Sequence, residues 1–380
     1  MDFAWSPEEE TYRKEIRAFL DAELPPDWTT RRRRPDSDEQ VARSKDFCGR
    51  LAERGWLTPH WPKEHGGRDA PAWQHMILGE ELWSIGEPRG PQYMNVNWIG
   101  PSIMAAGTDD QKRYHLGRIS RGDVIWCQGF SEPDAGSDLA SLKTRAQRDG
   151  DEYLINGQKI WTSYSNAAEF CYLLARTDPD APKHKGISIF LVPMTTPGLE
   201  VRDVHAVVGE HAFHELFFTD MRVPASTRLG PENEGWGIIR SVLSHERVGV
   251  PRYGRAMFQL GLIASWASER GLLADPGVAE RLGQAQAACE AARALVYKVV
   301  DERAKDVPPS PNAYVARAAM VQAEWAVGEA GMVVMGPDGL ELDTVADDQF
   351  RFGMTAGVAA GTYEVQLNLI AGLALDLPRS

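Results

Sequence analysis

The chain has 380 residues, of which 43% are hydrophobic and 25% charged, the balance of a globular protein with two or three domains. Its formal net charge of −13 argues against nucleic acid and anionic lipid as partners, because both repel an acidic surface. No apolar run is long enough to cross a bilayer, and the N-terminus lacks the basic-then-apolar order of a signal peptide. We therefore expect a cytoplasmic protein with no membrane contact.

Neither the cysteines nor the basic residues indicate an ion site. The four cysteines are scattered without the spacing of a metal site or a redox pair, which is typical of a reducing compartment. We expect no bound metal. The one strong basic run, Arg31 to Arg34, is best interpreted as a solvated loop, with a phosphate-binding arm as the alternative.

Residues 1–122 predict an N-terminal domain made of helices. Tyr12, Ile16, Phe19 and Leu20 recur at helical spacing and should share one apolar face. Gly55 follows a second helical pattern and is a typical stop signal.

The segment from Trp126 to Asp138 ends a strand-like run in a tight turn rich in proline and glycine. Ser131 and Ser137 offer hydroxyls there, and backbone N–H groups are exposed, although most such turns bind nothing. The order of residues resembles the Thr/Ser-Glu-Pro-x-Ala-Gly-Ser-Asp motif of the acyl-CoA dehydrogenase family. These are flavoproteins that oxidise acyl-CoA thioesters.

Residues 123–228 predict a compact β domain. Runs rich in β-branched and aromatic residues at 170–175, 186–192 and 215–219 indicate strands. The segment 153–161 indicates a hairpin that turns at Asn156-Gly157. By pattern alone, Trp161 at its end caps the core of this domain.

Residues 229–380 predict a C-terminal helical domain. Alanine-rich helices are expected at 279–304 and 313–332, separated by a loop at 308–311. Pattern alone supports an α+β protein of two or three domains. The resemblance runs along nearly the whole chain and implies a finer architecture: an N-terminal helical domain, a middle β-barrel or sandwich domain, and a C-terminal four-helix bundle.

A helix that begins near Asn233 carries a candidate base. Glu246 lies seven residues after Ile239 and four before Val250, within one apolar stripe. Burial disfavours a lone carboxylate and raises its pKa toward the range where a general base works best. A structural carboxylate paired with a nearby arginine is the alternative. The stripe consists of Trp236, Ile239, Val242, Leu243, Val250, Tyr253 and Met257.

The resemblance bears on the choice of base. Many relatives carry the catalytic glutamate near the C-terminus, just before a Gly-Thr pair, and Ala360 holds that place here. Other branches, such as the isovaleryl and long-chain enzymes, place it on the earlier helix directly before an arginine. Glu246-Arg247 matches that pattern, so the resemblance implies Glu246 as the base and Arg247 as its positioning residue. Glu364, about one helical turn beyond Ala360, is the lesser candidate.

The resemblance also implies FAD as the cofactor. No Gly-x-Gly-x-x-Gly pattern follows a strand, so a Rossmann crevice is not expected. In the family, the tryptophan matching Trp161 lies against the flavin, the hydroxyl of Ser163 lies near N5, and Ser131 lies near the pyrimidine end. Ser137, near the pantetheine or pyrophosphate of CoA, and Tyr253 are the expected substrate contacts. The expected cofactor contacts are Trp126, Gln128, Phe130, Ser131, Trp161, Ser163, Arg270, Gly336, Gly339 and Thr362.

The family completes its FAD site from a second subunit, and this chain departs from both motifs that the second subunit supplies. Arg270 keeps its register but lacks the Phe-Gly pair that follows it in the family. The loop 333–339 has Gly336 and Gly339 but lacks the glutamine and one glycine of the family motif, and Pro337 removes an N–H donor. The chain would therefore form a homodimer or homotetramer with a modified loop, or a heterotetramer with a related chain. Heteromers occur in the branch that handles bulky, steroid-like acyl-CoAs.

The function implied is FAD-dependent α,β-dehydrogenation of an acyl-CoA thioester to the trans-2-enoyl-CoA. Glu246 would remove the α-proton, flavin N5 would accept the β-hydride, and an electron-transferring flavoprotein would receive the electrons. Two alternatives stay open: a non-catalytic partner subunit that completes another chain's site, and a related flavin oxidase.

Overall fold

A computed structural model describes the backbone of residues 5–28, 38–246 and 251–378, and their side chains except at 38, 210, 211 and 241–246. The chain divides into two compact units. The helical unit comprises residues 1–32, 70–88 and 246–380, and the sheet unit comprises residues 33–69 and 89–245. Within the described ranges, no helix is both long and apolar enough to cross a membrane.

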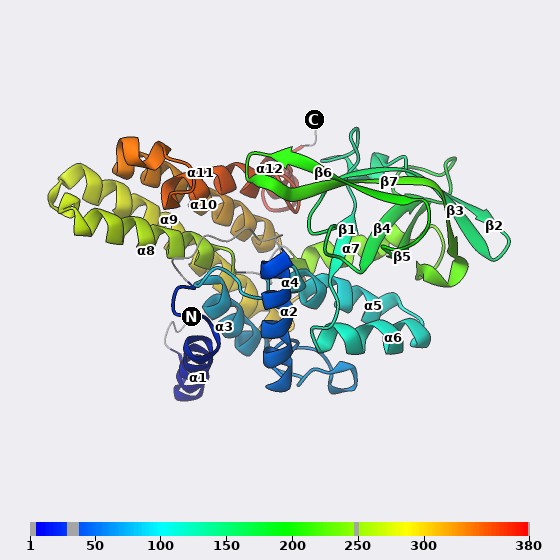
Figure 1. The fold of residues 1–380 in the computed structure, drawn as a ribbon, viewed down its shortest axis with the longest axis horizontal. Coiled ribbons are helices and arrows are strands. Elements are labelled where there is room, and N and C mark those ends of the chain that lie inside the picture. The colour runs from blue at the N-terminus through cyan, green and yellow to red at the C-terminus, as the bar shows by residue number, and fades with distance from the viewer. Residues whose placement is uncertain (1–4, 29–37, 247–250, 379–380) are drawn as a thin grey trace. The chain divides into compact units, whose positions relative to one another are not determined.

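In the helical unit, α8, α9 and α10 pack along one another (Figure 1). Small buried residues such as Ala285, Ala292 and Ala323 lie in their shared core. The two predicted alanine-rich helices and the proline-rich loop between them are confirmed. The helices are α1 (Pro7–Glu23), α3 (Ala72–Trp83), α8 (Tyr253–Glu269), α9 (Pro276–Ala304), α10 (Asn312–Met335), α11 (Val345–Ala356) and α12 (Tyr363–Leu373), with 3₁₀ turns η5 (Leu272–Ala274) and η6 (Gly336–Leu340).

The start of α1 shows how the sequence sets a helix boundary. The Ser6 hydroxyl accepts the Glu9 N–H at 3.2 Å, and the Glu9 carboxylate accepts the Ser6 N–H at 2.8 Å. This reciprocal capping satisfies two backbone donors that the first helical turn leaves unpaired. Ile16, Phe19 and Leu20 are buried, as their spacing predicts, and Tyr12 is half-buried.

The sheet unit joins helices to one mixed eight-stranded sheet with the order β6-β7-β3-β2-β4-β5-β8. β1 pairs in parallel with β4, and the strands predicted at 170–175, 186–192 and 215–219 are confirmed as β4, β5 and part of β7. The strands are β1 (Trp126–Gly129), β2 (Arg145–Asp149), β3 (Glu152–Thr162), β4 (Phe170–Arg176), β5 (Ile187–Pro193), β6 (Leu199–Ala206), β7 (Gly209–Pro224) and β8 (Arg228–Leu229). The helices are α2 (Asp38–Glu53), α4 (Gln92–Met94), the π-helical η2 (Asn95–Ile99), α5 (Gly100–Ala106), α6 (Asp109–Ser120) and α7 (Gly235–Glu246), with 3₁₀ turns η1 (Lys63–His65), η3 (Leu139–Ser141) and η4 (Ala225–Thr227).

The hairpin predicted at Asn156-Gly157 is wrong. β3 continues through both residues, and the turn lies earlier, at Gly150, between β2 and β3. Gly157 instead lies where the pairing of β3 with β7 shifts register. A glycine suits that position because its φ is 150° and an added Cβ would lie 2.6 Å from Thr144 Oγ1. Asn-Gly therefore marks an irregularity inside a strand here rather than a turn between strands.

The single helix predicted from Asn233 to Met257 is also wrong. α7 ends at Glu246, Pro251 is not helical, and α8 begins at Tyr253. Proline has no N–H to donate, which favours a break before α8. The apolar stripe thus belongs to two helices, and Val250 lies outside the described residues. The domain limits 1–122, 123–228 and 229–380 stay a prediction.

Candidate active site

A buried ion pair in the sheet unit holds the turn after β1 in place. Lys159 Nζ, on β3, lies 2.8 Å from Glu132 Oε1, and the two side chains are 0% and 6% exposed. Lys159 Nζ also donates to Phe130 O at 2.9 Å, and Glu132 accepts the N–H groups of Lys143 and Thr144 at 2.6 and 2.8 Å. Burial alone raises the pKa of Glu132, but Lys159 and these donors outweigh it and hold the pKa below its usual range.

Ser131 lies beside the end of β3, and Gln128 lies on β1, opposite Tyr172 of β4. The Ser131 carbonyl accepts the Ile160 N–H at 2.9 Å, and the Ser131 side chain is half-buried. Gln128 Nε2 is buried and has no hydrogen-bond partner among the described residues. An unpaired buried amide is costly unless a ligand or water satisfies it, so Gln128 has a donor to offer.

Trp161 is 55% exposed, so the prediction from pattern alone that it caps the core is wrong. Its backbone φ is 62°, and its ring lies edge-on to Phe213 at 5.8 Å. Thr162 follows with a buried hydroxyl that has no partner within the described part of the chain. Ser163 is half-buried beside it. The exposed indole is thus followed in the chain by two hydroxyl side chains, one buried and one half-buried.

These residues of β1 and β3 fit a flat aromatic cofactor with polar edges. The indole of Trp161 offers an apolar face, while Gln128 and Thr162 offer unsatisfied polar atoms. Ligand sites combine such apolar surfaces with a few placed polar groups. FAD, the cofactor expected from the sequence, has these properties in its isoalloxazine ring.

Trp126 and Ser137 lie in contrasting surroundings. Trp126 is fully buried and stacks on Phe170, with ring centroids 4.8 Å apart and planes at 23°. Its Nε1, like Gln128 Nε2, has no hydrogen-bond partner among the described residues, so the predicted cofactor contact stays a prediction. Ser137 is exposed in the turn beyond Glu132, where a ligand can reach it.

The predicted base lies at the end of an element. Glu246 is the last residue of α7, and its side chain is outside the described part of the chain. Arg247 also lies outside the described residues. Both roles stay predictions.

The turn at Ala360, where many relatives carry the base, is held by Arg317. Arg317 Nη2 donates to Ala356 O at 2.7 Å and to Ala359 O at 2.9 Å. Ala360 and Gly361 have φ values of 57° and 86°. The backbone therefore turns through the left-handed region at a residue that cannot accept a proton.

Thr362 begins α12 as its N-cap, and its hydroxyl accepts the Val365 N–H at 3.2 Å. Glu364 is exposed in the first turn of this helix. This capping hydrogen bond is a sufficient structural reason for a threonine at position 362. Its predicted contact with the cofactor stays a prediction.

The residues expected to reach FAD in a second subunit have distinct settings in the helical unit. The Arg270 guanidinium lies 4.1 Å above the Trp266 ring. Gly336, with φ 54°, opens η6, and an added Cβ there would meet open space. Gly339 is buried, and an added Cβ would lie 3.3 Å from Ala346 Cβ. Gly336 is thus open to a ligand, while Gly339 packs inward.

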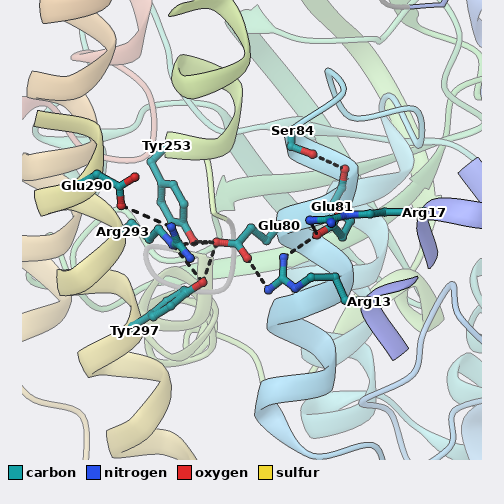
Figure 2. Close-up of polar contacts among 9 residues, drawn as sticks. All are labelled: Arg13, Arg17, Glu80, Glu81, Ser84, Tyr253, Glu290, Arg293 and Tyr297. Atoms are coloured by element: carbon teal, nitrogen blue, oxygen red, sulfur yellow. Dashed lines mark hydrogen bonds and ion pairs between the residues drawn. The ribbon is translucent and has the colours of Figure 1, made fainter. Parts of the chain in front are cut away.

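Tyr253, a predicted substrate contact, belongs to a buried polar network (Figure 2). Its hydroxyl donates to Glu80 Oε1 at 2.7 Å, beside a second donor, the Tyr297 hydroxyl at 2.8 Å. Arg13 Nη2 and Arg293 Nε lie 2.7 and 3.3 Å from the same carboxylate. Burial, and then the charge of Glu80, raise the pKa of Tyr253. This placement favours a structural role for Tyr253.

Sequence reasoning missed Lys159, which organises the turn after β1. The alternation of side chains along a strand could have revealed it. Lys159 lies an even number of residues after Tyr153 and Ile155, so it should face the core of the sheet unit as they do. A lysine at an inward position predicts a buried partner.

The predicted site residues fall in both units. The sheet unit holds Trp126, Gln128, Phe130, Ser131, Ser137, Trp161 and Ser163, and the helical unit holds Tyr253, Arg270, Gly336, Gly339 and Thr362.

Known proteins resemble the chain along its whole length. Three family descriptions match in order: "Acyl-CoA dehydrogenase, N-terminal domain" over residues 6–123, "middle domain" over 127–221 and "C-terminal domain" over 233–375. "Acyl-CoA dehydrogenase FadE26" of Mycobacterium tuberculosis is 32% identical, with 100% of both chains covered.

Two solved structures are also similar over 100% of both chains. One is "Tcur3481-Tcur3483 steroid ACAD", with a TM-score of 0.91 and 33% identity. The other is the "ChsE4-ChsE5 complex from Mycobacterium tuberculosis", with a TM-score of 0.88 and 31% identity. Both titles name two different chains.

Proposed function

Because the chain belongs to the acyl-CoA dehydrogenase family, whose members are FAD-dependent flavoproteins, we propose that Glu246 is the general base that begins the oxidation. Family membership carries the reaction class, acyl-CoA dehydrogenation. The product we propose is the trans-2-enoyl-CoA.

The observation that supports Glu246 most is the turn at Ala360. That turn has the Gly-Thr pair that follows the base in many relatives, but its residue 360 has only a methyl group. Glu364, the nearby alternative, is exposed in the first turn of α12. Glu246 is then the carboxylate that matches a family position for the base.

In the proposed reaction, Glu246 takes the proton from the α-carbon of the thioester, and Arg247 positions this carboxylate. Negative charge develops on the thioester oxygen, and a backbone N–H near Ala360 stabilises it by donating a hydrogen bond. Trp161, Ser163 and Gln128 would hold the flavin ring from the sheet unit. When bound, FAD would accept the β-hydrogen as hydride at N5.

We also propose a bulky, ring-containing acyl group as the substrate. The support is similarity over the whole chain to a structure titled as a steroid ACAD. Electrons would pass from the enzyme to an electron-transferring flavoprotein. Rapid turnover with oxygen as sole acceptor would instead indicate the oxidase.

A second candidate function is that of a half-site partner in a heteromer. Pro337 lies in the loop expected to reach FAD in a second subunit, and Gly339 packs inward. Two similar structures are named for two chains each. A related chain would then supply the other FAD half-site.

The test is anaerobic bleaching of protein-bound FAD by short, branched and steroid-like CoA esters, followed by mass analysis of the product. The purified chain should bind FAD, bleach, and yield a product two hydrogens lighter than the ester. Bleaching only after addition of a sister chain would support the heteromer. A chain that binds no FAD alone or with a sister chain would contradict both proposals.

A further inference from the structure

A fully buried histidine lies directly behind the Trp161–Ser163 segment. His214, on β7, pairs in register with Thr162 at the end of β3. Its Nδ1 lies 3.3 Å from Thr162 O, and its Nε2 lies 3.2 Å from Asp203 Oδ1 on β6. One imidazole therefore connects three neighbouring strands, β6, β7 and β3.

The backbone that His214 holds is strained. Trp161 has a φ of 62°, which is unfavourable for a bulky residue. The pairing of β3 with β7 also shifts register between Lys159 and Thr162. Such conformations persist only where surrounding contacts maintain them, and they concentrate at ligand sites.

The chemistry of the ring assigns its role. A carbonyl oxygen can only accept a hydrogen bond, so the Nδ1 that faces Thr162 O must carry a proton. The Asp203 carboxylate lies within ion-pair distance of the other nitrogen, Nε2, which makes no hydrogen bond within the described part of the chain.

We propose that His214, through its contact with the Thr162 carbonyl, is a positioning residue for the flavin. By fixing the Thr162 carbonyl, it keeps Trp161 in the left-handed conformation with its indole exposed. This inference rests on the proposed function, because it requires that FAD bind against Trp161. His214 touches neither substrate nor cofactor and acts through the backbone.

Three variants separate positioning from packing. His214→Phe keeps a ring but removes the donor, whereas His214→Asn retains a donor near the position of Nδ1. His205→Phe, at an exposed position on β6, is the matched control. The first readout is hydrogen exchange at residues 160–165, measured by mass spectrometry on the purified protein. The second is the Kd for FAD, together with the reduction potential of bound FAD.

His214→Phe should raise exchange at residues 160–165 and weaken FAD binding about tenfold, the effect of one ordinary hydrogen bond. It should also shift the potential. His214→Asn should restore both readouts, and His205→Phe should match the unsubstituted protein. Unchanged exchange in a folded His214→Phe variant would overturn the proposal, as would equal damage from His214→Asn.

Two further outcomes are also decisive. If His214→Phe does not fold, Asp203→Asn replaces it, since Asp203 is half-exposed; a local rise in exchange supports the proposal and no rise overturns it. If the unsubstituted protein binds no FAD, the proposed function fails. The exchange measurement then still decides whether His214 holds the Trp161 segment.

Discussion

Lys159 Nζ and Glu132 Oε1 lie 2.8 Å apart in a place that solvent hardly reaches, and this contact ties β3 to the turn after β1. The glutamate of the family-like Ser-Glu-Pro motif therefore has a structural task. It also accepts two backbone N–H groups, so the turn that carries Phe130 and Ser131 has little freedom. The positions of Phe130 and Ser131, two predicted flavin contacts, therefore depend on a buried ion pair.

Replacing Lys159 by methionine should destabilise the protein by about 3–5 kcal/mol, because Glu132 is left charged and buried without its partner. Urea unfolding measures the loss. Lys159→Met combined with Glu132→Gln should recover part of it. Lys143→Met, which breaks the exposed contact of Lys143 with Asp134, should cost less than about 1 kcal/mol. Equal losses from the two lysine variants would contradict the account.

His115 should make the protein sensitive to acid. Burial, and then the charge of Arg118, lower the pKa of His115 from 6.5 to about 4. The unfolded chain therefore binds the proton at a higher pH than the folded chain, so stability falls as the pH falls from about 6.5 to 4.

His115→Phe should remove this sensitivity. The loss of unfolding free energy between pH 7.5 and 4.5 should shrink by about 2 kcal/mol, as measured by urea unfolding at the two pH values. His184→Phe, at an exposed position, should leave the loss unchanged. A larger acid-induced loss in His115→Phe would mean that the sign is wrong.

Tyr253→Phe should test whether this residue is structural. Removing its hydroxyl deletes a hydrogen bond to the Glu80 carboxylate and should cost about 1–3 kcal/mol. Tyr297→Phe, which removes the neighbouring donor to the same carboxylate, should cost a similar amount. KM for the acyl-CoA should stay unchanged in both variants. If Tyr253→Phe raised KM without lowering stability, and Tyr297→Phe did not, the predicted role of Tyr253 as a substrate contact would be supported.

A glutamate introduced at position 360 should take over part of the proposed catalytic function of Glu246. Ala360 already has a φ of 57°, so glutamate adds little backbone strain. In the Glu246→Gln background, Ala360→Glu should raise the rate of FAD reduction about tenfold or more. Ala360→Gln in the same background is the neutral control. An unchanged rate in a folded, FAD-containing Glu246→Gln/Ala360→Glu variant would contradict the proposal that residue 360 lies beside the α-carbon of the ester.

The helical and β-rich stretches could be predicted because they depend on local patterns. The face of α1 with Ile16 and Phe19 and the alanine-rich α9 and α10 follow from spacing and composition. The placement of Asn156-Gly157 could not be predicted in this way. The same dipeptide suits a turn and a register shift, and pairing with β7 decides between them.

The site was predictable to a more limited extent. Motifs predict Ser131, Ser137 and Trp161 as ligand contacts; Ser131 is half-buried and the other two are exposed, and their roles stay predictions. Burial of Trp126 and Tyr253 depends on contacts with residues distant in sequence, such as Phe170 and Glu80. Neither contact has a local signal.

The most direct test of the central claim is the rate at which an acyl-CoA reduces FAD bound to Glu246→Gln, measured anaerobically by stopped flow. The ester is the one that bleaches the unsubstituted protein fastest. We predict normal FAD content and a reduction rate lower by about 10³-fold, the contribution of a general base. A rate equal to that of the unsubstituted protein would show that another group removes the α-proton.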